Sequence, residues 1–417
     1  MTDTADHRLN GAQLRLLALL SVATFFEGWD AIALTQVLPA LRKEMGLTPS
    51  HAGWLVGLTN IGTMAAFWLV RQADHWGRRK TMLWTLSGYT GMTALSGLAP
   101  DVWTLGVAQT LAKMFLIGEW ALSMVYAAEE FPAARRATVL GIVQAVAALG
   151  SVACAALAPL LVRAPMGWRT VYLVGALPAG LLLYLRRNLP ETRRFAELQG
   201  QPAASGQGLR AIWRTAYRGR IVRLAAVWTL IYACTQATIS FWKEFAVTER
   251  GLSDAQVGAS VAIAAAGAMP LVLFVGRFID GVGRRAGATV IFGVAAVSTW
   301  GAFSLHDRWA LTAMLLGGIF AASAVLPVLN AWTTELFPTQ WRGAAFAWTN
   351  NLLGRIGYVA GPVLVGQAAD RVGWGPAVAA TAVLPLVAIA LALLWLPETK
   401  GRSLEETAGL GPGEQLR

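Results

Sequence analysis

Twelve long apolar runs divide the chain, and each is long enough to cross the hydrocarbon core of a bilayer as a helix. A membrane-spanning helix needs about 20 residues, whereas a strand of a membrane barrel needs only about 10. Lipid offers the backbone no hydrogen-bonding partner, so only helices and closed barrels span it. The runs therefore predict an all-α membrane protein with twelve transmembrane helices, at 14–40, 50–70, 80–99, 102–128, 137–162, 167–187, 222–248, 254–276, 285–305, 308–334, 341–369 and 374–396.

A large soluble helical core is the alternative explanation for so much apolar sequence. The 417 residues are 56% hydrophobic and 14% charged, whereas soluble domains are about 45–50% apolar and about 25% charged. Soluble cores rarely contain a dozen runs of this length. The first run has no small-residue cleavage site after it, so we expect it to remain as a span rather than to be removed as a signal peptide.

A short polar motif occurs twice, each time between two apolar runs. Residues 74–79 (DHWGRR) and 280–285 (DGVGRR) both combine an acid, a glycine and paired arginines. Further residues recur at nearly the same interval: Glu129, Pro132 and Arg136 as Glu335, Pro338 and Arg342, and residues 190–192 (PET) as 397–399. This repetition indicates two copies of a unit of roughly 200 residues. We expect two pseudo-symmetric six-helix bundles at 1–187 and 222–396, a cytoplasmic linker at 188–221 and a cytoplasmic tail at 397–417.

The formal net charge of +11 is unevenly distributed. With the spans given above, most of the 34 Lys and Arg fall in loops on one side of the membrane. This asymmetry follows the positive-inside rule and predicts that both termini are cytoplasmic. A basic chain can instead bind nucleic acid, but no basic patch with interleaved aromatic residues remains to support that reading.

Five ionisable residues lie near the middle of the predicted spans, where a charge costs roughly 2.5–3.5 kcal/mol on insertion scales. They are Glu27, Asp30, Lys113, Glu119 and Arg355. Glu27 and Asp30 are three residues apart and therefore share a helix face. Two carboxylates in a dry cavity repel one another, and burial disfavours their charged forms, so either is a candidate for proton coupling. The alternative is that they only form ion pairs that hold the halves together.

Lys113 and Arg355 belong to different halves, and two cations that face a central cavity suit a carboxylate substrate. The alternative for Arg355 is a permanent ion pair with an acid in the membrane. Glu119 is a third candidate for proton coupling, or the counter-ion of Arg355. Aromatic and amide side chains near mid-span are candidate substrate contacts, although most Trp in membrane proteins lie at the interface or in the core. These candidates are Trp29, Trp54, Trp120, Tyr126, Gln236, Trp242, Asn330, Asn351 and Tyr358.

The duplicated loops also have a mechanical interpretation. Asp74 with Arg78, and Asp280 with Arg284, can form charge-assisted hydrogen bonds at the cytoplasmic mouth. Helix N-termini of the opposite half can bind the same carboxylates, so contacts that form and break would gate the mouth. The alternative is that the arginines only fix topology. The candidate gate also includes Gly77, Arg79, Gly283 and Arg285.

These motifs resemble the major facilitator superfamily. Residues 276–285 (GRFIDGVGRR) match its loop motif, and residues 396–402 (LPETKGR) resemble a signature of its sugar-porter-like branch. Residues 27–30 (EGWD) are similar to a motif of aromatic-acid/proton symporters, and residues 118–120 and 351–357 are similar to motifs of metabolite/proton symporters. The resemblance implies two six-helix bundles, alternating access and a gate at the duplicated loops. Where those symporters often carry an arginine, this chain has Gln109, with Lys113 one turn later as its candidate replacement.

The leading interpretation is a secondary active transporter that carries a small organic anion, for example an aromatic carboxylate, together with protons. A proton-coupled drug or metabolite efflux antiporter is the alternative. Gly141 and Gly150 fit an antiporter motif in the fifth span, but Cys154 and Ala155 replace its final Gly-Pro. A membrane sensor that does not transport is a third interpretation, although the linker and tail are too short for a signalling domain.

An enzyme is not expected, because the sequence has no metal cluster, nucleophile elbow or Walker phosphate loop. No cofactor is expected either. The expected partners are the substrate, protons and membrane lipid, with sodium as an alternative coupling ion and no nucleic acid. We expect a monomer in the bacterial inner membrane.

Overall fold

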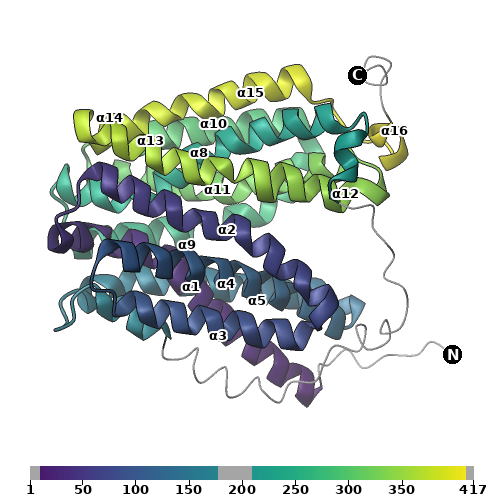
Figure 1. The fold of residues 1–417 in the computed structure, drawn as a ribbon. Helices are drawn as coiled ribbons and strands as arrows, with labels where there is room; N and C mark the ends of the chain where they lie inside the picture. Colours follow the sequence, from purple (N-terminus) through teal and green to yellow (C-terminus); the bar gives the residue numbers. More distant parts are fainter. Residues whose placement is uncertain (1–9, 177–208, 410–417) are drawn as a thin grey trace.

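The chain forms an all-α bundle, as the apolar runs predict. The computed structural model describes residues 10–176 and 209–409, and every regular element within them is a helix (Figure 1). The first half contains α1 (Gly11–Met45), α2 (Pro49–Trp76), α3 (Arg78–Gly97), α4 (Val102–Glu130), α5 (Ala133–Leu161) and the start of a sixth helix at 169–176. The second contains η1 (Ala211–Arg214), α8 (Arg218–Thr248), α9 (Asp254–Val282), α10 (Arg284–Ser304), α11 (Arg308–Glu335), α12 (Thr339–Phe346), η2 (Ala347–Gly354), α13 (Ile356–Val372), α14 (Trp374–Ala379), η3 (Ala380–Ala382), α15 (Val383–Trp395) and α16 (Leu404–Ala408).

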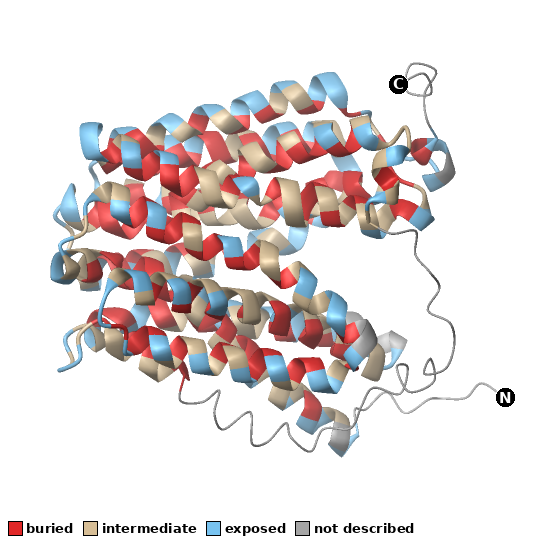
Figure 2. Ribbon diagram, viewed as in Figure 1, coloured by how far each residue is buried: buried red, intermediate tan, exposed pale blue. Residues whose placement is uncertain are grey.

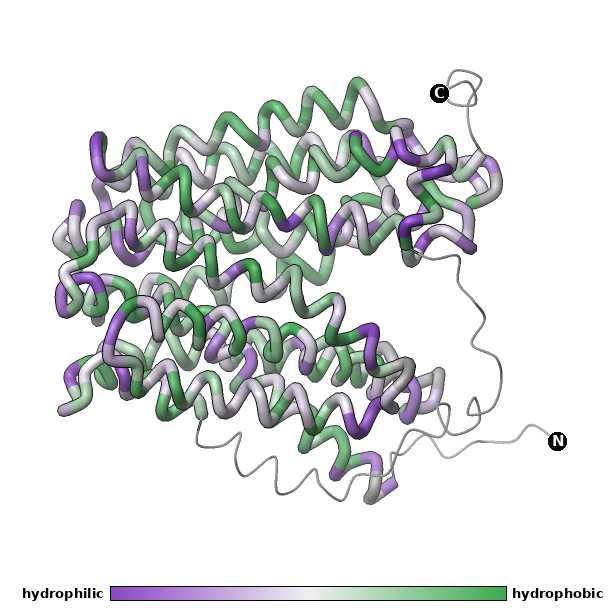
Figure 3. The backbone as a smooth tube through the Cα atoms, in the orientation of Figure 1, coloured by the Kyte–Doolittle hydropathy of each residue, from purple (hydrophilic) through white to green (hydrophobic). Residues whose placement is uncertain are grey.

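Among the described residues, eight helical segments are long and apolar enough to cross a membrane. α4 is not among them, and Gln109, Lys113 and Glu119 lie along it. Figure 3 shows hydrophilic residues gathered at the two ends of the bundle and hydrophobic residues along the middle. This distribution is that of an integral membrane protein. Residues 177–187 of the sixth predicted span and most of the predicted linker lie outside the described residues.

The eleventh span is not the continuous helix that we expected at 341–369. A π-helical segment, Ala347–Gly354, separates α12 from α13. The wider turn is supported from α8, where the Thr229 hydroxyl donates to the carbonyl of Leu353 (3.0 Å) and Tyr232 donates to Asn350 Oδ1 (3.2 Å). π segments of this kind occur frequently at functional sites.

The twelfth span also departs from a continuous helix. It is tightened to a 3-10 turn at Ala380–Ala382, between α14 and α15. Pro385 follows in the first turn of α15, and its ring nitrogen cannot donate a hydrogen bond to the preceding turn.

Among the described residues, three pairs of helices carry most of the contacts between the two halves: α2 with α13, α5 with α9, and α1 with α8. The first two pairs correspond under the internal repeat, because α2 and α9 are the second spans of their halves and α5 and α13 the fifth. In Figure 1 the second half (green to yellow) lies above the first (purple to blue). A hydrophobic cluster that includes Trp29, Val56, Phe241 and Val365 joins both halves. Figure 2 shows buried residues (red) distributed through both halves.

The contacts between halves are concentrated toward one end of the bundle. Arg42 of α1 forms an ion pair with Glu244 of α8, and the backbone N–H of Ser50 donates to Asp370 (3.2 Å). α2 and α13 cross closely here, since a Cβ at Gly53 would lie 2.6 Å from the carbonyl oxygen of Pro362. Toward the end that carries α16 and the beginning of α1, the ribbons of the two halves diverge (Figure 1).

Gly53 provides a test of this closed end. Gly53→Leu places a side chain against the backbone of α13, so we expect the closed arrangement to be disfavoured. The measurement is the disulfide cross-linking rate of a Ser50→Cys, Asp370→Cys pair, which should fall at least about tenfold, as expected for a clash above about 1.4 kcal/mol. Gly91→Leu is the control, because a Cβ at Gly91 has nothing within 4 Å. An unchanged rate in Gly53→Leu would contradict the packing.

Candidate functional site

A small polar cavity lies between α1, α2, α4 and α8. Its volume is about 20 Å³, which is room for one water molecule. Its polar lining residues are Asp30, Thr35, Gln109, Lys113, Gln236 and Ser240. An acid of α1 and a base of α4, both predicted from the sequence, thus face the same buried space.

Asp30 is held by one of its two carboxylate oxygens. The hydroxyl of Thr93 on α3 donates to Oδ2 (2.8 Å). Oδ1 is buried and has no hydrogen-bond partner within the described part of the chain. Tyr89 of α3 also adjoins this carboxyl group, but its hydroxyl donates to the carbonyl oxygen of Phe26 (3.1 Å), so Oδ1 keeps an open position for a proton or a donor.

The other two predicted acids lie away from this cavity. Glu27 is 3% exposed and, like Asp30, interacts electrostatically with Tyr89 of α3. Glu119 is fully buried and accepts hydrogen bonds from Thr85 (2.6 Å) and Ser123 (3.3 Å). Glu119 therefore ties α4 to α3, whereas the described hydrogen bond of Lys113 goes to another residue.

Lys113 is part of a polar chain that crosses between the halves. Its Nζ donates to Asn60 Oδ1 on α2 (3.0 Å), and Asn60 Nδ2 donates to the carbonyl oxygen of Tyr358 on α13 (2.8 Å). Asn60 was not predicted from the sequence. The hydrogen bond of Lys113 is thereby linked, through Asn60, to the contact between α2 and α13.

Arg355 approaches the same interface from the second half. Its guanidinium donates to the carbonyl oxygen of Thr63 on α2, and its Nε is buried without a hydrogen-bond partner in the described segments. Arg355 and Lys113 are close enough to repel each other. Among the described acids, none forms an ion pair with either cation. Two like charges at one interface create a site that an anion would stabilise.

Aromatic rings adjoin Arg355. Tyr232 and Tyr358 stack with centroids 4.2 Å apart and planes inclined by 25°. Trp228 packs against Tyr232 at 4.8 Å. Both tyrosines interact electrostatically with Arg355. Of the predicted substrate contacts, Tyr358 therefore lies beside the cations.

The remaining predicted contacts are dispersed. Gln236 lines the cavity and donates to Ser240 (3.1 Å). Trp29 donates to the carbonyl oxygen of Val171 (3.1 Å), and Trp120 is 37% exposed and donates to Gln144 (3.4 Å). Trp242 lies in the hydrophobic cluster that joins the halves. None of these three tryptophans lines the cavity.

Four further side chains were also predicted. Asn330 has a buried Oδ1 without a hydrogen-bond partner in the described segments. Asn351 is half-buried in the π segment, where its neighbour Asn350 receives the bond from Tyr232. Trp54 is 45% exposed, and Tyr126 is buried in a cluster of the first half.

Several residues that contact the site were not predicted from the sequence. These residues are Thr35, Asn60, Thr93, Ser240 and Asn350. Each is an uncharged polar residue within a span. The available signal was the four-residue spacing of Gln236 and Ser240, which places both on one helix face.

The duplicated loops form contacts within their own halves. Arg284 forms ion pairs with Asp280 (3.2 Å) and Glu335 (2.8 Å). In the first half, Arg78 lies 3.5 Å from Glu129 and donates to the carbonyl oxygen of Ala73 (2.8 Å). The side chain of Asp74 lies outside what the structure describes. So does Glu191, the counterpart of Glu398 in the first half. The predicted Asp280–Arg284 contact is present, and the described ion pairs of both loops stay within one half.

Glycines set the backbone of both loops. Gly77 and Gly283 have φ of 93° and 95°, a conformation that other residues rarely adopt. Gly283 precedes α10 and has no side chain that could cap the N-terminus of this helix. Glu398 supplies the cap from the end of the twelfth span, through hydrogen bonds of 2.9 Å from the backbone N–H groups of Arg284 and Arg285. Arg79 is exposed, and Arg285 donates to the carbonyl oxygen of Leu393.

The cap makes a pH-dependent contribution to stability. Burial opposes ionisation of Glu398, but backbone N–H donors of Arg284, Arg285, Lys400 and Thr399 outweigh it and hold the pKa of this carboxyl below its usual value. The resulting stabilisation is fully present above the unfolded pKa, about 4.3. It is lost as the pH falls through the lower folded pKa.

Glu398→Gln should therefore lower the melting temperature at pH 7, and the difference from the wild type should shrink as the pH falls below about 4. Thermal unfolding in detergent at several pH values measures this. Glu406→Gln is the control, because Glu406 is exposed and its described bond caps only the short helix at Ser403. A difference that stays constant between pH 7 and low pH would contradict the cap.

Comparison with known proteins adds the family to this geometry. The sequence matches the Major Facilitator Superfamily over residues 20–362 and 231–412. The chain is 27% identical to a gallate transporter of Pseudomonas putida, with 94% of each chain covered. It is 24% identical to a niacin transporter of Acinetobacter baylyi, with 94% of this chain and 95% of the relative covered.

A solved structure shares the fold. It is a bacterial homologue of the human lysosomal transporter Spinster in an inward-facing, unoccupied form, with a TM-score of 0.79 and 16% identity. The alignment covers 97% of this chain and all of that one. The relatives are named as transporters and not as enzymes. The apolar helical bundle, the duplicated loops and the family match together establish that the chain is an integral membrane transporter and belongs to the major facilitator superfamily.

Proposed function

We propose that this transporter carries a small organic anion with protons, by alternating access between its two halves. The observation that supports this most strongly is the convergence of Lys113 and Arg355. They come from opposite halves, have no described acidic partner, and lie at an interface whose cavity is also lined by Asp30. An anion that bridges them would draw the halves together.

The polar chain suggests how binding is coupled to movement. A substrate carboxylate that accepts from Lys113 competes with Asn60, and Asn60 in turn holds the carbonyl of Tyr358. Loading therefore frees Asn60 Oδ1 beside the hydrogen bond by which Asn60 Nδ2 joins α2 to α13. Asp30, with one open oxygen, carries the proton, and Glu27 and Glu119 are secondary candidates for proton coupling. The cavity holds only one water molecule, so the helices must separate to admit a ring.

The names of two relatives, the gallate and niacin transporters, support an aromatic carboxylate as the substrate. Gallate and niacin are both acids in which a carboxyl group is attached to an aromatic ring. The stacked Tyr232 and Tyr358 beside Arg355 provide an aromatic surface next to a guanidinium that can bind a carboxylate. Arg355 and Lys113 would bind the carboxylate, and the tyrosine pair would pack against the ring.

The proposal also assigns each end of the bundle to one side of the membrane. With both termini in the cytoplasm of a bacterial cell, the end where the halves diverge is cytoplasmic and the Arg42–Glu244 end is external. The described state is then inward-facing. The ion pairs of Arg78 and Arg284 within their own halves fit a gate that is released in this state.

Uptake into proteoliposomes tests the proposal. Purified protein is reconstituted, and uptake of labelled niacin, gallate and neutral nicotinamide is followed with and without an inward proton gradient. We expect accumulation of at least one carboxylate, dependent on the gradient, and little transport of nicotinamide. Gradient-independent uptake of every carboxylate would contradict symport, and accumulation that needs an outward gradient would favour the antiporter.

A further inference from the structure

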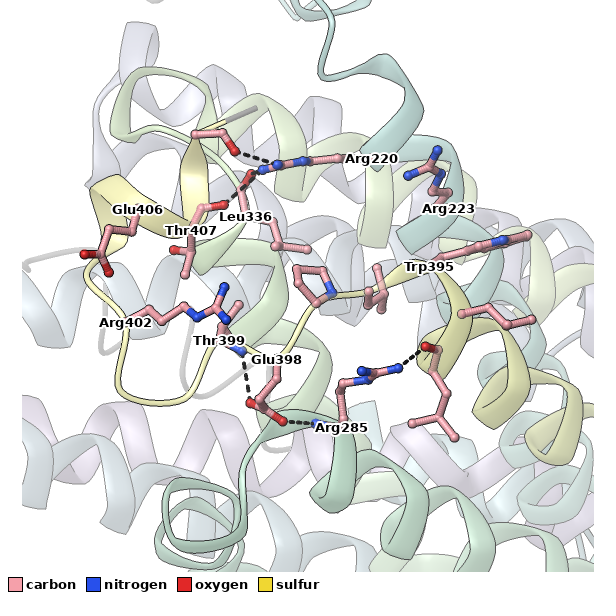
Figure 4. A pocket seen from close by; sticks show the side chains of 15 residues that line it. Arg220, Arg223, Arg285, Leu336, Trp395, Glu398, Thr399, Arg402, Glu406 and Thr407 are labelled. Carbon is pink, nitrogen blue, oxygen red and sulfur yellow. Dashed lines mark hydrogen bonds between the residues drawn. The ribbon is translucent and has the colours of Figure 1, made fainter. Parts of the chain in front are cut away.

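A second, larger pocket lies at the end of the second half where α8 and α10 begin and α15 ends (Figure 4). It encloses about 510 Å³. Its charged lining residues are Arg220, Arg223, Arg285, Arg402, Glu398 and Glu406. The pocket is separate from the cavity at Asp30, and the proposed transport mechanism does not use it.

The acids of this pocket are already engaged. Both oxygens of Glu398 accept backbone N–H groups at the start of α10, at 2.9 Å. Glu406 is exposed and accepts the backbone N–H of Ser403 (3.1 Å). With four arginines against two occupied carboxylates, the pocket has a surplus of positive charge.

Two of the arginines offer donors that the described chain does not use. Arg402 is exposed, and its guanidinium makes no hydrogen bond or ion pair with a described residue. Arg285 donates to the carbonyl of Leu393, while its Nε is buried without an acceptor in the described segments. Arg220 is fixed in the wall by the carbonyl oxygens of Leu336 (2.8 Å) and Thr407 (3.1 Å). The pocket is therefore prepared for an anion with several acceptor oxygens.

The rim of the pocket is apolar on the side of α15. Leu394 is 77% exposed, Leu393 is 39% exposed and Trp395 is 40% exposed. They occupy the last turn of a membrane-spanning segment, where a tryptophan is typical of the boundary between lipid and water. A soluble anion would gain nothing from this rim, whereas a headgroup that carries acyl chains would cover it.

We propose that the pocket binds the phosphate group of an anionic membrane lipid. The phosphodiester accepts from Arg402 and Arg285, Arg223 adds positive charge at the rim, and the acyl chains follow the exposed leucines of α15. Basic pockets between spans are a known form of lipid headgroup site. Since Glu398 links the pocket to α10, bound lipid would stabilise the second half as a unit.

Thermal unfolding of the full-length protein in detergent tests the site with three probes. They are dihexanoyl phosphatidylglycerol, dihexanoyl phosphatidylcholine and inorganic phosphate. We expect the phosphatidylglycerol to raise the melting temperature in a saturable manner, and the other two probes to have little effect at the same concentration. In an Arg402→Gln, Arg223→Gln variant, half-saturation should need at least about tenfold more lipid.

Arg277→Gln is the matched control, because Arg277 is exposed on α9 and does not line the pocket. It should bind lipid as the wild type does. Arg402→Gln alone should weaken binding less than the double change does, and it keeps the test valid if the double variant is unstable. Equal shifts with both lipids, or an unchanged half-saturation in the variants, would overturn the proposal. A shift produced by inorganic phosphate alone would reassign the site to a free anion and overturn its assignment to lipid.

Discussion

Replacement of Arg355 by Gln should strongly weaken selective transport of the carboxylate. The guanidinium donates to the carbonyl of Thr63 and leaves Nε available in the buried interface. A buried hydrogen bond between charged groups contributes about 1.5–3 kcal/mol. We therefore expect the half-saturation concentration for niacin to rise about 10-fold to 100-fold. Lys113→Met should have an effect of similar size.

Two controls separate substrate recognition from general damage. Arg355→Lys keeps the charge but loses the planar fork, so it should retain part of the affinity. Nicotinamide has the same ring without the negative charge, and its weak transport should be unaffected by Arg355→Gln. If both ligands lost transport equally, Arg355 would be a structural residue and not a carboxylate ligand.

Replacement of Asp30 by Asn should separate transport from its energy source. Asn has nearly the same shape and can still accept the bond from Thr93, but it cannot take up a proton. We expect accumulation driven by a proton gradient to disappear. Exchange of labelled for unlabelled substrate across the membrane should remain, because exchange requires no net proton movement.

Thr93→Val is the matched control for Asp30. It removes the described hydrogen bond to Oδ2 but leaves the titrating carboxyl in place. Gradient-driven accumulation should therefore persist, with a shifted pH dependence. Normal accumulation in Asp30→Asn would exclude Asp30 as the proton carrier and direct attention to Glu27.

The spans could be predicted from the sequence because hydrophobicity over about 20 residues is a local property. The division into two halves could be predicted as well, because the repeated loop motifs are also local in sequence. The break at Ala347–Gly354 could not be predicted, since it is supported by the Thr229 hydroxyl of another helix. Local sequence carries no record of such a contact.

The site was only partly predictable, because its residues differ in the free energy that burial in a membrane costs. A charge such as Lys113 or Arg355 is expensive within a membrane, so its presence alone suggests a function. Asn60 and Thr93 are cheaper to bury, and many such residues merely bond to their own helix, so the sequence does not distinguish them. Trp242 has the opposite problem: it was a candidate contact, but packing places it in the hydrophobic cluster between the halves.

The central claim is that one transport cycle moves a carboxylate and a proton in the same direction. The most direct measurement is the internal pH of proteoliposomes, followed with a trapped dye, when niacin or gallate is added outside. The proposal predicts acidification that accompanies substrate uptake with wild-type protein and is absent with Asp30→Asn, beyond the slow change in protein-free liposomes. Substrate uptake by the wild type without any change of internal pH would contradict the account.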